Sequence, residues 1–163
     1  MAEEQQQPIF NIEKLYVKDL SVEVPNAPQI FLEREQPKID IQLATKANNV
    51  NEDHFEVVLS VTATATFPAM EADGKDAPAR SVFLVEVHQA GIFQIRNIAK
   101  ENMEAVLGIH CPNILFPYVR ETISDAVGRA GFPTFYLAPV NFEAIHQARL
   151  QAQQAQQNKP TQH

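Results

Sequence analysis

Alternating apolar and polar residues dominate the first hundred positions and predict an antiparallel sheet of about four strands. The clearest segment is 54–67, where every second residue from Phe55 to Phe67 is apolar or alanine. A period of two is typical of a strand with one buried face. The opposite face is rich in threonine and uncharged over most of its length. We therefore expect this face to meet another sheet or another subunit rather than water, with Thr62 and Thr64 as candidate subunit contacts.

Three further strands are predicted at 9–24, 37–43 and 81–88, the last resuming at 92–95 after an interruption at 89–91. In the first of these, the apolar positions change face twice. A regular strand keeps its apolar residues at one parity, so we predict one β-bulge near Glu13-Lys14 and another near Lys18-Asp19.

A change to helical spacing follows, because apolar residues between Pro112 and Gly131 recur three and four positions apart. Proline suits the first helical turn, and glycine suits the position just past the last turn. A shorter helix is predicted from Asn97 to Gly108, and a last one from Phe142 to about Gln154. Strands followed by helices indicate an α+β domain.

Two apolar rows run along the long helix, one through Leu115 and Val119 and one through Tyr118 and Ile123. Together they form a stripe wider than one core contact needs. We therefore expect the protein to assemble, with Leu115, Val119 and Ile123 as candidate subunit contacts.

The chain is predicted to form one domain at 9–150, between a flexible polar arm at 1–8 and a disordered Gln-rich tail at 151–163. Its 163 residues carry a formal net charge of −7, which argues against a nucleic-acid partner. No apolar run is long enough for membrane insertion, and the single cysteine suits a reducing compartment. These features favour a cytoplasmic protein.

Catalytic chemistry has little support in the sequence, which contains no nucleotide-binding or hydrolase motif. His110 and Cys111 are the only neighbouring histidine and cysteine, too few ligands for a typical zinc site. A packed cysteine explains them best, although a helix start could make the thiol reactive. We expect no enzyme and no metal site.

Acidic residues next to apolar ones indicate a possible binding surface more clearly than the histidine and cysteine do. Asp19 and Glu23 lie four apart and therefore share a strand face, as do Leu84 and Glu86. Together they would form an acidic patch with an apolar centre, which suits a basic partner segment.

Several blocks of the sequence resemble SecB, the bacterial protein-export chaperone family. They are residues 18–28 (KDLSVEVPNAP), 83–87 (FLVEV), 90–93 (AGIF), 111–121 (CPNILFPYVRE), 132–133 (FP) and 137–142 (LAPVNF). The blocks follow the family order and span about residues 10–145.

The resemblance implies a homotetramer built as a dimer of dimers, without a cofactor, nucleotide or metal of its own. Members of the family hold unfolded presecretory proteins in hydrophobic grooves and deliver them to the SecA ATPase. Carried over position by position, the SecA-binding residues would be Asp19, Glu23, Leu84 and Glu86.

The same resemblance implies client grooves along the crossover, the second strand and the helical layer. The groove candidates are Phe31, Ile39, Ile41, Leu43 and Phe142. Family members often carry an aromatic residue before the Gln-Pro of the crossover, whereas this chain has Glu35 before Gln36.

Two alternatives remain at this point. One keeps the fold but dedicates the chaperone to an antitoxin, which predicts weak SecA binding. The other is a small-molecule-binding protein or enzyme that uses His110 or Cys111.

Overall fold

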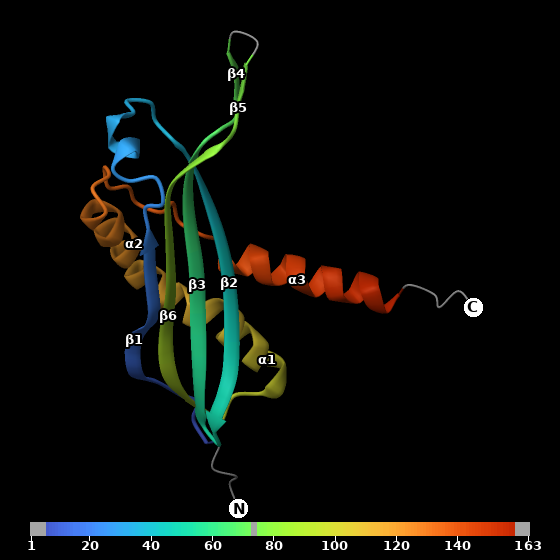
Figure 1. Cartoon of the computed structure of the whole chain (residues 1–163). Helices are drawn as coiled ribbons and strands as arrows, with labels where there is room; N and C mark the ends of the chain where they lie inside the picture. Colours follow the sequence, from blue (N-terminus) through green and yellow to red (C-terminus); the bar gives the residue numbers. More distant parts are fainter. Residues whose placement is uncertain (1–5, 73–74, 159–163) are drawn as a thin grey trace, which may run out of the picture.

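A four-stranded antiparallel sheet forms the body of the protein, as the sequence predicts (Figure 1). The computed structural model describes residues 6–72 and 75–158. In spatial order the strands are β1 (Ile9–Glu23), β6 (Arg80–Arg96), β3 (His54–Phe67) and β2 (Lys38–Asn51). The short strands β4 (Met70–Ala72) and β5 (Lys75–Ala77) pair with each other beyond one end of the sheet. The α+β prediction is confirmed.

Helices cover one face of the sheet. They are α1 (Lys100–Ala105), the π-helical segment η2 (Val106–His110) and α2 (Cys111–Arg129), and α2 packs mainly on β6 and β3. A 3₁₀ turn, η1 (Gln29–Leu32), lies in the crossover between β1 and β2. The last helix, α3 (Phe142–Gln157), points away from the sheet on the side of β2 (Figure 1). None of the described helices is long and apolar enough to cross a membrane.

Both predicted bulges in β1 are present, between Ile12 and Lys14 and between Val17 and Asp19. Each adds one residue and resets the alternation. As a result, the apolar residues of β1 other than Ile9 and Tyr16 share the helix-facing side, and its acidic residues Asp19 and Glu23 share the outer side.

Strand β6 is continuous, so the predicted interruption at residues 89–91 is wrong. Gly91 serves packing instead. A Cβ atom there would lie 2.7 Å from the ring of Phe93 and 3.1 Å from the side chain of Leu15. Glycine lets the aromatic ring lie over the strand without breaking its hydrogen bonds.

The helical layer starts later and runs more continuously than predicted. Asn97 has a positive φ of 59° and lies before the first helix, which begins at Lys100. From there α1, η2 and α2 follow one another directly. The end of α2 is as predicted: Gly131 has φ 95°, and the Phe132 N–H donates to the Val127 carbonyl. This is the Schellman arrangement that closes a helix.

The buried row of α2 lies in the core of the single chain. Leu115, Val119 and Ile123 have no exposed surface, so their assignment to a subunit interface is wrong. A further side of α2, outside the predicted stripe, is also covered by the same chain. Phe116 packs edge-on against Phe142, and the Arg120 Nε–H donates to the Leu137 carbonyl at 3.0 Å.

The predicted tail is partly helical. Asn141 caps α3 by accepting a hydrogen bond from the Ala144 N–H, and the helix continues to Gln157. Disorder from Gln151 is therefore wrong for residues 151–157, because glutamine and alanine are good helix formers. Residues 159–163 of the predicted tail, and residues 1–5 of the predicted arm, lie outside the described residues.

Candidate functional site

The acidic patch predicted from sequence is assembled by the pairing of β1 with β6. Asp19 lies opposite His88, Ser21 opposite Glu86, and Glu23 opposite Leu84. Opposite residues in an antiparallel pair have neighbouring side chains. The four residues Asp19, Glu23, Leu84 and Glu86 thus share the outer face of the sheet, away from the helices. We call this set the acidic patch.

His88 holds the central carboxylate of the acidic patch. Its Nε2 atom lies 2.9 Å from Glu86 Oε1, and its Nδ1 atom lies within hydrogen-bonding distance of Ser60 Oγ. Glu86 therefore has a fixed orientation while its side chain stays partly exposed. Sequence reasoning missed His88 because its nearest acidic neighbour comes into contact only through the strand geometry.

A second polar cluster lies farther along the same face. Glu56 accepts hydrogen bonds from the Tyr16 hydroxyl and from Lys18 Nζ. The lysine and the hydroxyl together lower the pKa of the Glu56 carboxyl below its usual value. Burial and the same carboxylate raise the pKa of Tyr16 to about 12. Because Glu56 is neutralised by a local cation, it adds little to the negative charge of the acidic patch.

The threonine face competes with the acidic patch for the same surface. Thr62 lies opposite Glu86, and Thr64 lies opposite Leu84, on the same outer face. A subunit covering these threonines would also cover the patch. The subunit contact at Thr62 and Thr64 and the acidic patch thus involve one surface, and both stay predictions.

The predicted groove residues of β2 share the helix-facing side of the sheet. Ile39, Ile41 and Leu43 pair with Ala65, Ala63 and Val61 of the buried face of β3. Although they face the helical side, Ile39 and Ile41 are 40 % and 39 % exposed. Helix α3 extends past β2 (Figure 1), and the exposure of Ile39 and Ile41 shows that it does not bury them. We call these three residues the β2 stripe.

An aromatic pocket of about 530 Å³ adjoins the β2 stripe at Ile39. Phe31 of the crossover stacks on Phe132 at 5.0 Å between ring centroids, and Phe132 in turn contacts Phe83 at 5.1 Å. Phe135 and Glu35 also line the pocket. The 132–139 segment is apolar in sequence, but only the fold reveals that it lies against the crossover.

Gly131 allows the crossover to approach α2. A Cβ atom at this position would lie 3.0 Å from the Phe31 ring. The crossover is also held from the sheet side, where Arg80 pairs with Glu33 at 2.6 Å and lies over the Phe67 ring. The aromatic pocket is thus walled by two segments fixed to the core.

Phe142 does not belong to this exposed surface. It is 2 % exposed and packs against Phe116, so its assignment to the client groove is wrong. An aromatic residue in the first turn of an amphipathic helix can either pack in the core or line a groove. The sequence does not distinguish these two roles.

Strand β1 carries an apolar surface that sequence reasoning did not single out. Ile12, Val17, Leu20 and Val22 are between 42 % and 48 % exposed, although they face the helical side of the sheet. The strand lies at the edge of the sheet, and α2 packs mainly on β6 and β3. We call these four residues the β1 edge.

His110 and Cys111 do not form a reactive site. The Cys111 side chain is fully buried, and burial raises the pKa of its thiol to about 12. His110 packs edge-on against Phe10 at 4.8 Å. Neither residue lines the pocket described above. This arrangement gives no support to a small-molecule enzyme centred on these residues.

We expect the native protein to react with a thiol reagent at pH 8 far more slowly than the unfolded protein does. Only the thiolate attacks, and burial suppresses both its formation and its contact with the reagent. Since the unfolded thiol ionises at lower pH than the folded one, the free energy of unfolding should also fall as the pH rises from about 9 to about 12. Labelling with and without denaturant measures the first effect, and fast native labelling would contradict it.

Comparison with known proteins agrees with this architecture. The family described as preprotein translocase subunit SecB matches residues 3–153. The protein-export protein SecB of Aromatoleum aromaticum is 62 % identical over 88 % of this chain and 84 % of its own length. That of Methylobacillus flagellatus is 54 % identical over the full length of both chains.

A solved structure has the same fold at much lower identity. The SecB-like chaperone of Mycobacterium tuberculosis, in complex with an antitoxin peptide, superposes with a TM-score of 0.55 at 17 % identity. The superposition covers 81 % of this chain and 88 % of that one. Family model, curated relatives and fold agree, and the chain belongs to the SecB family of protein-export chaperones.

Proposed function

We propose that this protein holds unfolded precursor proteins on the β2 stripe and in the aromatic pocket and delivers them to SecA through the acidic patch. The observation that carries the proposal is the exposed apolar side of β2, which leads directly into the aromatic pocket. Exposed apolar surface of this kind is typical of a binding site for apolar segments. Family membership supplies the class of client.

Binding a client in this way requires no covalent bond to be formed or broken. Each Å² of apolar client surface that is buried contributes roughly 25 cal/mol before entropy losses. A client that folds quickly hides its apolar segments before capture, whereas a slow one stays bound. Preferential binding of unfolded chains shifts the client's folding equilibrium toward the unfolded state.

Assembly as a dimer of dimers would multiply these sites. We assign the contacts to the β1 edge and to the outer side of α2, where Tyr118 is 48 % exposed. Several weak sites on one assembly bind a long client more tightly by effective concentration. We place this activity in the cytoplasm, where precursors await export and a free cysteine stays reduced.

Light scattering coupled to size-exclusion chromatography tests the proposal. We expect a tetramer that gains one slow-folding, signal-bearing precursor when the precursor is held unfolded, and gains nothing when the same precursor is folded. A monomer or dimer that ignores unfolded chains would overturn it. Dedication to an antitoxin would appear as one dominant partner in pull-downs and as weak binding to SecA.

A further inference from the structure

A histidine lies among the residues of the acidic patch. His88 of β6 lies opposite Asp19 of β1 and opposite Ser60 of β3, and it contacts Glu86 on its own strand. Its side chain is 30 % exposed and that of Glu86 is 41 % exposed, so solvent and a partner can reach both. The charge of a histidine ordinarily changes between pH 5 and pH 8. The surface around Glu86 therefore contains a group whose charge can change near neutral pH.

The hydrogen bonds of His88 determine which nitrogen carries the hydrogen in the neutral ring. Glu86 Oε1 lies 2.9 Å from Nε2, and a carboxylate can only accept, so Nε2 carries the hydrogen. Nδ1 must then accept, and the Ser60 hydroxyl, within hydrogen-bonding distance, donates to it. Neutral His88 thus orients Glu86 through one hydrogen bond and leaves the negative charge of the carboxylate to a basic partner.

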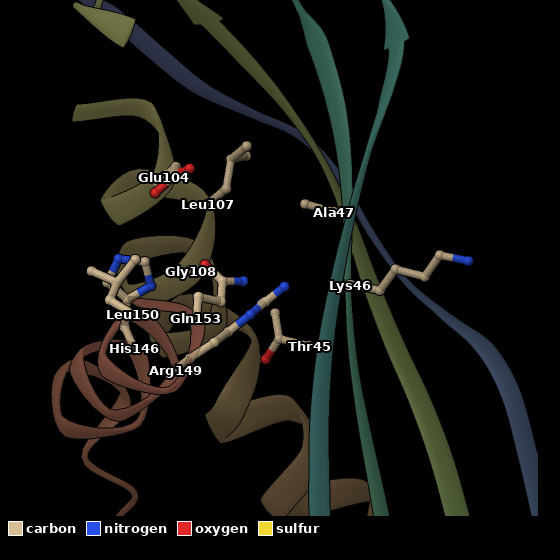
Figure 2. A pocket seen from close by; sticks show the side chains of 10 residues that line it. All are labelled: Thr45, Lys46, Ala47, Glu104, Leu107, Gly108, His146, Arg149, Leu150 and Gln153. Carbon is tan, nitrogen blue, oxygen red and sulfur yellow. The ribbon is translucent and has the colours of Figure 1, made fainter. Parts of the chain in front are cut away.

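The other charged groups near His88 come from the neighbouring strands. Asp19 of β1 lies opposite it, and the Nζ atom of Lys18, the preceding residue, lies 2.8 Å from Glu56 Oε1 of β3. Lys46 of β2 borders a second pocket, of about 310 Å³, but its side chain points away from α3 (Figure 2). Strand β3 separates it from β6. Since Lys18 is paired with Glu56 and Lys46 lies two strands away, a protonated His88 would be the cation in direct contact with the acidic patch.

Protonation of His88 changes its contact with Glu86 from a hydrogen bond to an ion pair. Nδ1 then carries a hydrogen as well, and the Ser60 oxygen accepts it once its own hydrogen has turned away. The imidazolium cancels one of the three carboxylate charges of Asp19, Glu23 and Glu86. A basic segment would then have to displace His88 from Glu86 or bind a surface with less negative charge.

We propose that His88 is a positioning residue of the acidic patch: the neutral ring orients Glu86 toward a basic partner segment, and the protonated ring competes with that segment for the same carboxylate. The inference rests on the proposed function and adds a pH dependence to its delivery step. Client capture should not share this dependence, because the β2 stripe lies on the helix-facing side of the sheet.

The test measures the affinity for labelled SecA of the wild type and of His88→Gln, each at about pH 8 and at about pH 6. Glutamine can still donate to Glu86 but cannot be protonated, and any titration of SecA itself is common to both proteins. On going to the lower pH, we expect the wild type to lose about threefold more affinity than His88→Gln, the size of one partly exposed charge pair. His88→Val, which can neither donate nor titrate, should bind SecA more weakly than His88→Gln already at about pH 8.

His54→Gln is the matched control. His54 also lies near a carboxylate, with its Nε2 atom 3.9 Å from Glu13 Oε1, but it is the first residue of β3 and lies farther along the sheet from the acidic patch. This variant should respond to pH as the wild type does.

The inference alone is overturned if the wild type and His88→Gln respond equally to pH, or if His88→Gln and His88→Val bind SecA equally at about pH 8. Absence of SecA binding at both pH values would overturn the delivery step of the proposed function, and the inference with it. An unfolded precursor, titrated against the same proteins, should bind all of them alike at each pH. A dependence of client capture on His88 would contradict the assignment of His88 to the partner surface.

Discussion

Reversing the charge of Glu86 with Glu86→Lys is expected to weaken binding to SecA at least about tenfold while leaving capture of unfolded clients unchanged. Glu86 is the centre of the acidic patch, held there by His88 and flanked across the strand pair by Asp19 and Glu23. A lysine would meet a basic partner segment with like charge. Because the residue lies on the outer face, the β2 stripe on the helix-facing side is unaffected.

Titration of labelled SecA and of an unfolded precursor against the same variant separates the two effects. Glu52→Lys is the control: it makes the same charge change at an exposed turn between β2 and β3, far along the chain from the patch. It should leave both affinities near wild type. An equal loss of client and SecA binding in Glu86→Lys would mean that the two surfaces are not separate.

The second large effect is on stability: Leu115→Ala should lower the free energy of unfolding by about 2–5 kcal/mol. Leu115 has no exposed surface and belongs to the core between α2 and the sheet. Truncation removes buried methyl groups and leaves a cavity that the packed strands cannot fill. Urea unfolding at matched protomer concentration measures the change, since assembly makes apparent stability depend on concentration.

Tyr118→Ala provides the contrast on the same helix. Tyr118 is 48 % exposed, so its loss should change protomer stability by less than about 1 kcal/mol. Under the proposed assembly, it should instead raise the concentration at which the tetramer dissociates. If Tyr118→Ala destabilised the protomer more than Leu115→Ala, the assignment of the two helix faces would be wrong.

The strands of this fold are largely predictable because the alternation of apolar and polar residues depends only on neighbouring positions in the chain. Two changes of parity in residues 9–24 were enough to locate both bulges of β1, since a bulge must shift the alternation by one residue. Gly131 likewise marked the end of α2 through its backbone alone. The grouping of Asp19, Glu23, Leu84 and Glu86 was predicted as well, although the resemblance contributed to it.

What covers each apolar surface was harder to predict. The wide stripe of α2 suggested a partner subunit, but Leu115, Val119 and Ile123 are buried in the chain's own core, and only Tyr118 of the four residues that define it stays 48 % exposed. Four apolar residues of β1 that face the helical layer stay between 42 % and 48 % exposed, because α2 packs mainly on β6 and β3. An amphipathic pattern indicates that one face of a helix or strand is apolar. It does not indicate which other element packs on that face. Pockets formed by distant segments, such as Phe31 with Phe132, are hidden for the same reason.

The two bulges of β1 also bear on aggregation. A long, regular, apolar edge strand is a template onto which any extended chain can add as a further strand. The two irregularities divide β1 into three short stretches of regular pairing, Ile9–Ile12, Lys14–Val17 and Asp19–Glu23. On its β1 side, a protein that holds unfolded chains is thereby protected from being extended by them into a growing sheet before a second subunit covers this edge.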